Sequence, residues 1–381
     1  MRILFSYGLV GRGGDAVQVI EMAESFRQLG HVVELVGPHE LQPYEFAGTE
    51  GHLRNWLRRF PWWAKDTIEL GLQLRLWRQA RHRLGCSSFD LVFHRAGIYD
   101  LVGVPLARAA CCPSIIHLDA PFPIERAFRN DGYFACLHRR CMRRLGKVAE
   151  LVVTVSTASR DYYVELGLPE AKILVQPNGV PQRLLQKGTE LARLHRPFAQ
   201  GPPFTIGFVG SLSRWHRVDL LLEALHLLEA EYPGRFRLYI VGHGEEYPNL
   251  RMLERKLGIG DRITWFGPLP HEHAFEQIAL FDIAVLPNTL PTGAPIKLFE
   301  YAAMARPVIL PDLENLRGLF TEKEMCFVAP GSPRVLAETL LKLCSDQDAT
   351  RRVGQKAQQR VQQYTWESII TQLLRTLNRC A

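Results

Sequence analysis

The chain has 381 residues, of which 47% are hydrophobic and 22% are charged, and its formal net charge is +7 at neutral pH. These proportions are those of a globular protein and exclude a disordered or collagen-like chain. The length exceeds what one hydrophobic core usually supports, so we expect two domains. No apolar run reaches the roughly 18 to 20 residues that cross a bilayer, and no secretory leader precedes the first apolar segment, so we expect a cytoplasmic protein.

The cysteines and the positive charge are distributed differently. Eight cysteines are scattered without a C-x-x-C pair, so we expect reduced thiols and no zinc site. The positive charge concentrates in 54–83, where arginines alternate with tryptophans, and in 126–147. Such stretches suit a membrane surface, a lipid pyrophosphate or a nucleic acid. A solvated basic helix face whose tryptophans pack into the core is an equally good interpretation.

The chain opens with a strand, a glycine-rich loop, a helix and a second strand. The strand spans 2–6, the loop holds Gly13 and Gly14, the helix spans 16–29 and the second strand spans 31–36. This order is typical of a β-α-β unit with a right-handed crossover. The glycines do not match the dinucleotide pattern G-x-G-x-x-G, and no acidic residue ends the second strand where the ribose of NAD would need one.

Further strands at 90–95 and 114–117 each end near a histidine. Ligands gather at the carboxyl ends of parallel strands, so His94 and His117 are candidate site residues. A hydrogen-bonded residue at the edge of the core explains His94 equally well. After a strand at 151–155, a helix at 158–166 and a strand at 173–176, residues 182–203 lose periodicity and predict an interdomain linker.

A second β-α-β domain begins at the strand 204–210. Its loop 211–216 leads into a helix, and strands follow at 237–242, 263–267, 283–287 and 308–310. The last helix, from 364 onward, has one apolar side. Between the final two strands, Pro295 suits the first position of a helix that Arg306-Pro307 ends.

The helix that starts at Pro295 carries the most informative residues of the chain. A helix N-terminus at the carboxyl end of a strand is a site for phosphate. Lys297 lies in the first turn, where it conflicts with the helix dipole unless an anion is bound beside it. Glu300 lies on the same side one turn later and can accept hydrogen bonds from a ribose diol. The pair therefore predicts a nucleotide-sugar pocket; the alternative is a chance surface pair on an amphipathic helix.

The stretch from Gly293 to Ile309, GAPIKLFEYAAMARPVI, resembles a known signature. It is similar to the form SPLKLFEYMAAGKPVV of the retaining GT-B glycosyltransferases of glycosyltransferase family 4. The resemblance implies an α/β protein with two Rossmann-like domains that face each other across a cleft, and a C-terminal helix that crosses back to the first domain. The implied units are an acceptor domain at 1–185, a linker at 186–203, a donor domain at 204–360 and the returning helix at 361–381.

The resemblance also implies roles for residues of the first domain. The loop with Gly13 and Gly14 faces the cleft and the donor. The sequence PSIIHLDAPFPIER places His117 where the family holds a hydroxyl of the donor sugar. Asp119 contacts the sugar or the acceptor, and His94 is assigned to the same sugar and acceptor group.

In the second domain, the loop after 210 corresponds to the family loop that grips the diphosphate. Ser211, Arg214, His216 and Arg217 supply donors there, although His216 stands where a lysine is usual and Arg217 where a glycine is usual. The remaining residues that we assign to donor binding follow the strands or open the helix at 295, and they are Gly242, Gly267, Leu269, Gly293, Ala294, Pro295, Ile296, Lys297 and Glu300. Thr292 faces the sugar at a position where the common form has a glutamate.

The function that the resemblance implies is transfer of a sugar from a UDP- or GDP-sugar with retention of the anomeric configuration, in glycan, glycolipid or glycosylated-metabolite synthesis. His117, Lys297 and Arg214 form the expected catalytic set. We expect no metal and no cofactor, because helix capping explains the D-x-D letters at 346–348 better than metal binding does. The basic stretches favour a lipid-linked or membrane-proximal acceptor at the inner face of the membrane, with a soluble acidic acceptor as the alternative.

Three other functions are open at this point. A non-catalytic nucleotide-sugar binder would keep the pocket without turnover. A GT-B-fold epimerase would need acid and base carboxylates facing the sugar, and Thr292 makes that set poorer. Nucleic-acid binding through the arginine- and tryptophan-rich stretch would show a steep salt dependence, and we do not expect it.

Overall fold

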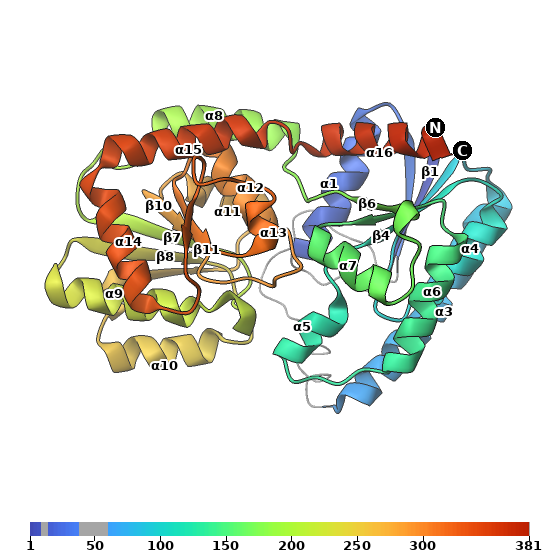
Figure 1. Cartoon of the computed structure of the whole chain (residues 1–381), viewed down its shortest axis with the longest axis horizontal. Helices are drawn as coiled ribbons and strands as arrows, with labels where there is room; N and C mark the ends of the chain where they lie inside the picture. The colour runs from blue at the N-terminus through green and yellow to red at the C-terminus, as the bar shows by residue number, and fades with distance from the viewer. Residues whose placement is uncertain (9–13, 38–59, 381) are drawn as a thin grey trace.

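A computed structural model describes residues 1–8, 14–37 and 60–380. It shows two α/β lobes side by side, each built on a six-stranded sheet (Figure 1). Gly13 and the first part of the arginine- and tryptophan-rich stretch lie outside the described residues. Within the described ranges, no helix is long and apolar enough to cross a membrane.

The first lobe, which we call the N-lobe, holds six parallel strands in the order β2-β1-β3-β4-β5-β6. The strands are β1 (Arg2–Tyr7), β2 (Val32–Val36), β3 (Leu91–Arg95), β4 (Ser114–Leu118), β5 (Leu151–Thr154) and β6 (Ile173–Val175). Their helices are α1 (Gly14–Gln28), α3 (Trp62–Cys86), α4 (Gly103–Ala110), α5 (Phe122–Phe128), α6 (Ala135–Val148) and α7 (Thr157–Glu165). The strands β3, β4 and β5 are buried along their whole length, as expected for a parallel sheet covered on both faces.

The second lobe, the C-lobe, holds six strands in the order β12-β11-β10-β7-β8-β9. They are β7 (Phe204–Val209), β8 (Phe236–Val241), β9 (Ile263–Gly267), β10 (Ile283–Val285), β11 (Val308–Pro311) and β12 (Cys326–Val328). The helices of this lobe are α8 (Gln182–Leu194), α9 (Val218–Glu231), α10 (Tyr247–Leu257), α11 (His271–Ile278), α12 (Ile296–Ala303), α13 (Glu314–Arg317), α14 (Pro333–Ser345) and α15 (Gln347–Val361).

The segment expected as an aperiodic linker begins with a helix instead. Helix α8 lies against the C-lobe and packs on α12. Its buried side comprises Leu184, Leu185 and Gly188, and a Cβ on Gly188 would lie 2.8 Å from the backbone oxygen of Ala303. The sequence obscured this helix because a glycine, normally a helix-weakening residue, occupies the position of closest approach.

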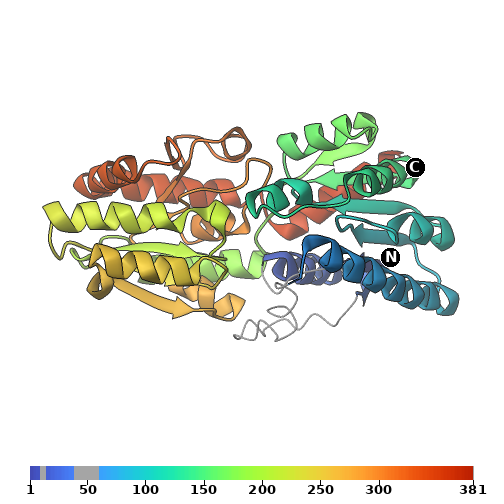
Figure 2. The same cartoon turned by 90° about the horizontal axis from the view of Figure 1, so that it is seen from below.

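The last helix, α16 (Trp366–Cys380), returns to the N-lobe, as the resemblance implied. Its apolar side joins the core cluster that contains β1 and α1, with Trp366, Ile370 and Leu373 buried. Figures 1 and 2 both show α15 over the C-lobe and α16 over the N-lobe. The chain therefore passes between the lobes twice, once before α8 and once between α15 and α16. At the crossing, Val180 and Thr365 form an isolated parallel bridge.

Candidate active site

The candidate site is built where the carboxyl end of β7 meets the start of α12. Lys297 is in the first turn of α12, and its side chain is partly buried. Its Nζ lies 3.1 Å from Nε2 of His216 and 4.6 Å from the centre of the Phe208 ring. Gly210 ends β7 with a φ of +140°, and a Cβ there would lie 2.3 Å from the Lys297 Nζ. The glycine is therefore required both by the backbone and by the ammonium group packed on it.

His216 acts as a hydrogen-bond acceptor for Lys297 in this structure, and its role as a donor to diphosphate stays a prediction. The His216 Nδ1 lies 2.7 Å from the backbone oxygen of Ser211, so Nδ1 carries the hydrogen and Nε2 is free to accept. Burial, and secondly the charge of Lys297, lowers the pKa of His216 well below its ordinary value. A neutral imidazole with both nitrogens occupied cannot supply positive charge to a phosphate.

The ammonium of Lys297 is strongly desolvated. Burial lowers its pKa from 10.5 to about 7, and the negative charge of Glu300 opposes only part of this effect. No acceptor among the described residues takes the backbone N–H of Ile296 or Lys297, and Pro295 gives the helix no side-chain cap. Two N–H groups without an acceptor among the described residues and a partly buried amine thus belong to the same first turn, which is the arrangement expected of an anion site at a helix N-terminus.

Glu300 lies one turn further on the same helix and is almost fully buried. Its Oε1 accepts a hydrogen bond of 2.5 Å from Nε2 of His271, the first residue of α11. The Nδ1 of the same imidazole lies 3.6 Å from Glu21 of α1 in the N-lobe. Burial works to lower the pKa of His271, but Glu300 and Glu21 outweigh it and raise the pKa to about 10. The imidazole is therefore a cation between two carboxylates.

The loop before α12 is held by side chains of the N-lobe. The backbone oxygen of Thr292 accepts hydrogen bonds from the hydroxyls of Ser156 (2.6 Å) and Ser159 (2.8 Å) at the start of α7. The backbone oxygen of Ala294 accepts one from Asn178 (2.7 Å). These bonds fix the loop that leads into the anion site while joining it to the N-lobe.

The structure separates the predicted roles of the residues in this loop. The N–H of Gly293 donates to the backbone oxygen of Leu290 at 3.2 Å, so it is occupied within the loop and does not fit its predicted contact with the donor. The hydroxyl of Thr292 is buried and has no hydrogen-bond partner among the described residues. A buried hydroxyl without a partner is costly, which makes Thr292 a candidate for a ligand contact.

On the N-lobe side, His117 and Asp119 lie at the end of β4. His117 is buried, and burial followed by the charge of Arg95 lowers its pKa to about 3, so it is a neutral imidazole. Its Nδ1 has no partner within the described part of the chain. Asp119 accepts a hydrogen bond of 2.9 Å from the Arg95 guanidinium, which also lies 3.4 Å from Asp15. The predicted pair is thus positioned by Arg95.

His94 does not share this environment. Its Nδ1 lies 2.6 Å from the hydroxyl of Ser6 and its Nε2 contacts the carboxylate of Asp100, and all three side chains are buried. Both ring nitrogens are therefore committed inside the N-lobe. The alternative interpretation of His94, a hydrogen-bonded residue at the edge of the core, describes its placement, and the assignment to sugar or acceptor does not.

The two arginines of the loop after β7 each lie beside a carboxylate of the C-lobe. Arg214 is 56% exposed, and its guanidinium lies 3.9 Å from Glu246. Arg217 adopts the left-handed conformation, with a φ of 49°, and pairs with Asp219 at 2.8 Å. The loop thus keeps the backbone geometry that favours glycine, and the substitution is accommodated by orienting the side chain toward solvent.

The glycines at the ends of β8 and β9 allow backbone conformations with a positive φ. Gly242 has a φ of +130°, and a Cβ there would lie 2.0 Å from the oxygen of Gly210, so it permits two loops to pack directly. Gly267 has a φ of +70° and accepts a hydrogen bond from the N–H of Gly242. Leu269, in the following turn, is partly buried against the C-lobe core. Ser211 is exposed beside this loop.

Sequence reasoning missed His271 and the side chains that anchor the loop before α12. In the sequence, His271 is not distinguished from any other polar residue at the start of a helix. Its two carboxylate neighbours, Glu21 and Glu300, are 250 and 29 positions away in the chain. Asn178 and Ser156 lie in the short segments that follow β6 and β5, where no periodic pattern marks them. The signal that could have found them is shared location: each follows a strand at its carboxyl end.

No group of three or more metal-binding side chains occurs among the residues that the structure describes. The capping interpretation of Asp346 is confirmed, because its Oδ1 accepts a hydrogen bond of 3.0 Å from the N–H of Ala349 at the start of α15. Asp348 pairs with Arg351 on the same helix.

The GT-B class is defined by two Rossmann-like lobes and a final helix that crosses back to the first lobe. In this chain a helix with a lysine in its first turn begins where the lobes meet. Solved structures agree: HepE of Anabaena, in complex with UDP, has a TM-score of 0.72 at 20% identity over the whole of both chains. Sucrose-phosphate synthase of Thermosynechococcus elongatus has a TM-score of 0.74 at 17% identity, also over both whole chains. At these identities the likeness concerns the fold.

Family comparisons cover both lobes. The family described as "Glycosyltransferase Family 4" matches this chain at residues 12–184, and the family described as "Glycosyl transferases group 1" matches it at residues 203–346. The chain belongs to this family of glycosyltransferases. The predicted family and the predicted GT-B fold are therefore confirmed.

Relatives with named activities are 24% to 28% identical in sequence to this chain. The D-inositol 3-phosphate glycosyltransferase of Corynebacterium urealyticum is 28% identical over 62% of this chain, and the alignment spans 58% of that protein. The protein of the same name from Nocardia farcinica is 25% identical over 93% of this chain and 82% of its own length. A GDP-mannose-dependent mannosyltransferase of Mycobacterium tuberculosis that acts on phosphatidylinositol monomannoside is 24% identical over 62% of this chain and 63% of its own length.

Proposed function

We propose that this chain transfers a sugar from a nucleoside-diphosphate sugar to an acceptor with retention of the anomeric configuration. The observation that carries the proposal is the environment of Lys297: a partly buried amine at a helix N-terminus whose neighbours are a neutral imidazole and an aromatic ring. Within the described chain no carboxylate forms an ion pair with it. A diphosphate is a ligand that would restore its charge, and Glu300 lies one turn away at a position suited to a ribose.

Transfer on this site needs no protein nucleophile. The developing charge on the leaving diphosphate would be stabilised by the Lys297 ammonium and by the N–H groups that open α12, all of them in place before the reaction. His117 would hold a hydroxyl of the sugar as a neutral imidazole that can donate and accept. The leaving phosphate can then guide the acceptor hydroxyl to the same face of the sugar, which retains the configuration.

The donor and acceptor classes draw on the relatives. Related proteins are named for inositol 3-phosphate or for GDP-mannose and a phosphatidylinositol, and the structural neighbour HepE binds UDP and UDP-glucose. We propose a UDP- or GDP-hexose as donor and a lipid-linked or membrane-proximal acceptor. No metal takes part in this proposal, because the lysine and helix N–H groups take the role that a cation has in other phosphate sites.

A panel of UDP-, GDP- and dTDP-sugars, assayed for release of the nucleotide and for a change at the sugar, tests the proposal. We expect release from one base class, and we expect Lys297→Ala and Glu300→Ala each to abolish it while the fold is retained. Lys342→Ala and Glu338→Ala, which remove exposed charges of the same types from α14, are the matched controls. Near-wild-type rates in either site variant would contradict the site. Binding without release would favour the non-catalytic binder, and inversion of a sugar carbon without transfer would favour the epimerase.

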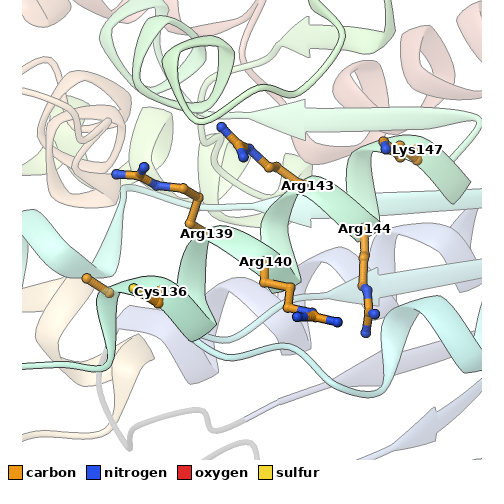
Figure 3. Close-up of a pocket in the computed structure, with 7 residues that line it drawn as sticks. Cys136, Arg139, Arg140, Arg143, Arg144 and Lys147 are labelled. Carbon is orange, nitrogen blue, oxygen red and sulfur yellow. The ribbon is translucent and has the colours of Figure 1, made fainter.

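The membrane-proximal acceptor is supported by helix α6 of the N-lobe. Its outward side carries Arg139, Arg140, Arg143, Arg144 and Lys147, and its opposite side is buried in the lobe. Figure 3 shows Arg139 and Arg143 extending from one flank of the helix and Arg140 and Arg144 from the other. None of these side chains forms an ion pair with a described residue. Arg143 donates a hydrogen bond to the backbone oxygen of Leu166. The face is thus free to meet an anionic bilayer.

Sedimentation with vesicles tests this surface. Each arginine or lysine close to an anionic bilayer contributes about 1 kcal/mol, so Arg140→Gln combined with Arg144→Gln should weaken binding to phosphatidylglycerol vesicles about 30-fold. The control combines Arg352→Gln with Lys356→Gln on α15, which removes the same charge from exposed positions of the C-lobe. Equal losses in both variants, or equal binding to neutral phosphatidylcholine vesicles, would contradict the assignment. Tighter binding to polynucleotide than to vesicles would replace it with a nucleic-acid surface.

A further inference from the structure

A line of four alternating charges passes through Glu21 of the N-lobe and ends at the candidate ribose position. Arg183 at the start of α8 forms two short hydrogen bonds, of 2.6 and 2.7 Å, to the carboxylate of Glu21. Glu21 lies 3.6 Å from Nδ1 of His271, whose Nε2 donates to Glu300 at 2.5 Å. Both carboxylates and the imidazole are largely buried, so the contacts are weakly screened by solvent.

A positive charge on His271 is unusual at the N-terminus of a helix. It is the first residue of α11, where the positive end of the helix dipole disfavours a cation. The two carboxylates reverse that preference. Burial tends to raise the pKa of Glu21, but the hydrogen bonds from Arg183 and His271 outweigh it and lower that pKa. The charges of Glu21 and His271 are therefore favoured by their neighbours.

We propose that His271 is a positioning residue that orients the carboxylate of Glu300 for the ribose of the donor and ties that orientation to contact between the lobes through Glu21. The inference rests on the proposed function of Glu300. One oxygen of Glu300, Oε1, is held by His271, and no described residue hydrogen-bonds the other, Oε2. A carboxylate fixed in this way presents one oxygen in a set direction, which lowers the entropy lost when two hydroxyls bind it.

The consequence is selective for ribose. Without His271 the Glu300 side chain loses its fixed rotamer, so nucleotides that use their ribose hydroxyls lose affinity. Nucleotides that lack those hydroxyls lose nothing, because the diphosphate is bound elsewhere, by Lys297 and the start of α12. A merely structural link between the lobes would weaken both kinds of nucleotide equally.

The experiment compares UDP with 2′,3′-dideoxy-UDP, and GDP with 2′,3′-dideoxy-GDP, by calorimetry on the full chain. In the wild type, the base that binds should show a preference for the ribonucleotide of about 30-fold, because two hydrogen bonds to a carboxylate are involved. His271→Ala should reduce this preference to about 3-fold with the dideoxy affinity unchanged. His271→Gln, which keeps an N–H donor near the Nε2 position, should restore part of the preference.

A double-mutant cycle decides whether His271 acts through Glu300. In the Glu300→Gln background, His271→Ala should cause no further change in the ribose preference. Equal loss of ribo- and dideoxynucleotide affinity in His271→Ala, an unchanged preference, or additive effects in the cycle would each overturn the inference. A wild type that binds both nucleotides equally would instead overturn the ribose role of Glu300 in the proposed function, so the two failures are distinguishable.

Discussion

Replacing Lys297 with methionine should stabilise the isolated protein while removing its activity. The side chain of methionine has a similar length and no charge, so it fills the space beside Phe208 and Gly210 without the cost of a desolvated amine. Lysine is retained at this place, on our account, because function requires the charge. Functional sites commonly conflict with stability in this way.

The magnitude follows from the pKa of Lys297. The amine has an ordinary pKa of 10.5 and a pKa of about 7 in the folded chain, and this difference corresponds to about 4 to 5 kcal/mol of folding free energy. The unfolded chain binds the proton more tightly, so the cost is complete below pH 7, shrinks as the pH rises and vanishes above pH 10.5. Loss of the hydrogen bond to His216 offsets about 1 kcal/mol. The expected gain is about 3 kcal/mol at pH 7 and close to zero at about pH 9.5.

Urea unfolding of both proteins at the two pH values measures the gain. Lys342→Met, on the exposed side of α14, is the control and should change stability by less than about 0.5 kcal/mol. Transfer by Lys297→Met should fall about 100- to 1,000-fold, the usual effect of removing one preorganised donor to a developing negative charge. A methionine variant that is less stable than the wild type at pH 7, or whose gain does not depend on pH, would refute the burial of a charged amine at this site.

The other predictions concern the surroundings of the same amine. Gly210→Ala should weaken binding of UDP or GDP more than 10-fold because its Cβ would meet the Lys297 Nζ, whereas Gly201→Ala, which has a positive φ but open space, should cost only about 1 kcal/mol of stability; equal effects on binding would contradict the steric argument. Arg217→Gly should raise stability by about 1 kcal/mol by relieving a left-handed arginine and should leave transfer within about 3-fold, and a large loss of transfer would return Arg217 to the diphosphate site. Binding of the nucleotide above pH 7 should take up a proton on Lys297, so affinity should fall as the pH rises from 7 to 9, and calorimetry in buffers of different ionisation enthalpy would show no uptake if the idea is wrong. Millimolar EDTA should leave the rate unchanged; a loss that Mg²⁺ restores would contradict metal-independent transfer.

The order of elements was predictable from the sequence because each strand of a covered parallel sheet is a short, continuous apolar run. The strands around Ile3, Val153 and Phe208 were found in this way, and the return of the last helix was implied by the family resemblance alone. Helix α8 was missed because Gly188 occupies its contact with α12, and a glycine is read as a break unless the partner surface is known.

The site was predictable only in part, for a geometrical reason. Lys297 and Glu300 lie on one helix turn, so their relation follows from local periodicity. The direction of Arg214 and Arg217, and the acceptor role of His216, depend on groups that approach from other elements. His271 depends on Glu21, which the sequence places 250 residues away and only the packing of the two lobes brings near. Long-range partners of this kind are invisible to patterns along the chain.

The central claim is that the start of α12 binds the diphosphate of the donor and that Glu300 binds its ribose. A crystal structure of the wild-type protein with UDP or GDP, whichever it binds more tightly, tests both halves together. We predict phosphate oxygens within hydrogen-bond distance of the Lys297 Nζ and of the N–H groups of Ile296 and Lys297, with a ribose hydroxyl on Glu300. A nucleotide bound in any other place, with Lys297 still facing His216, would contradict the account.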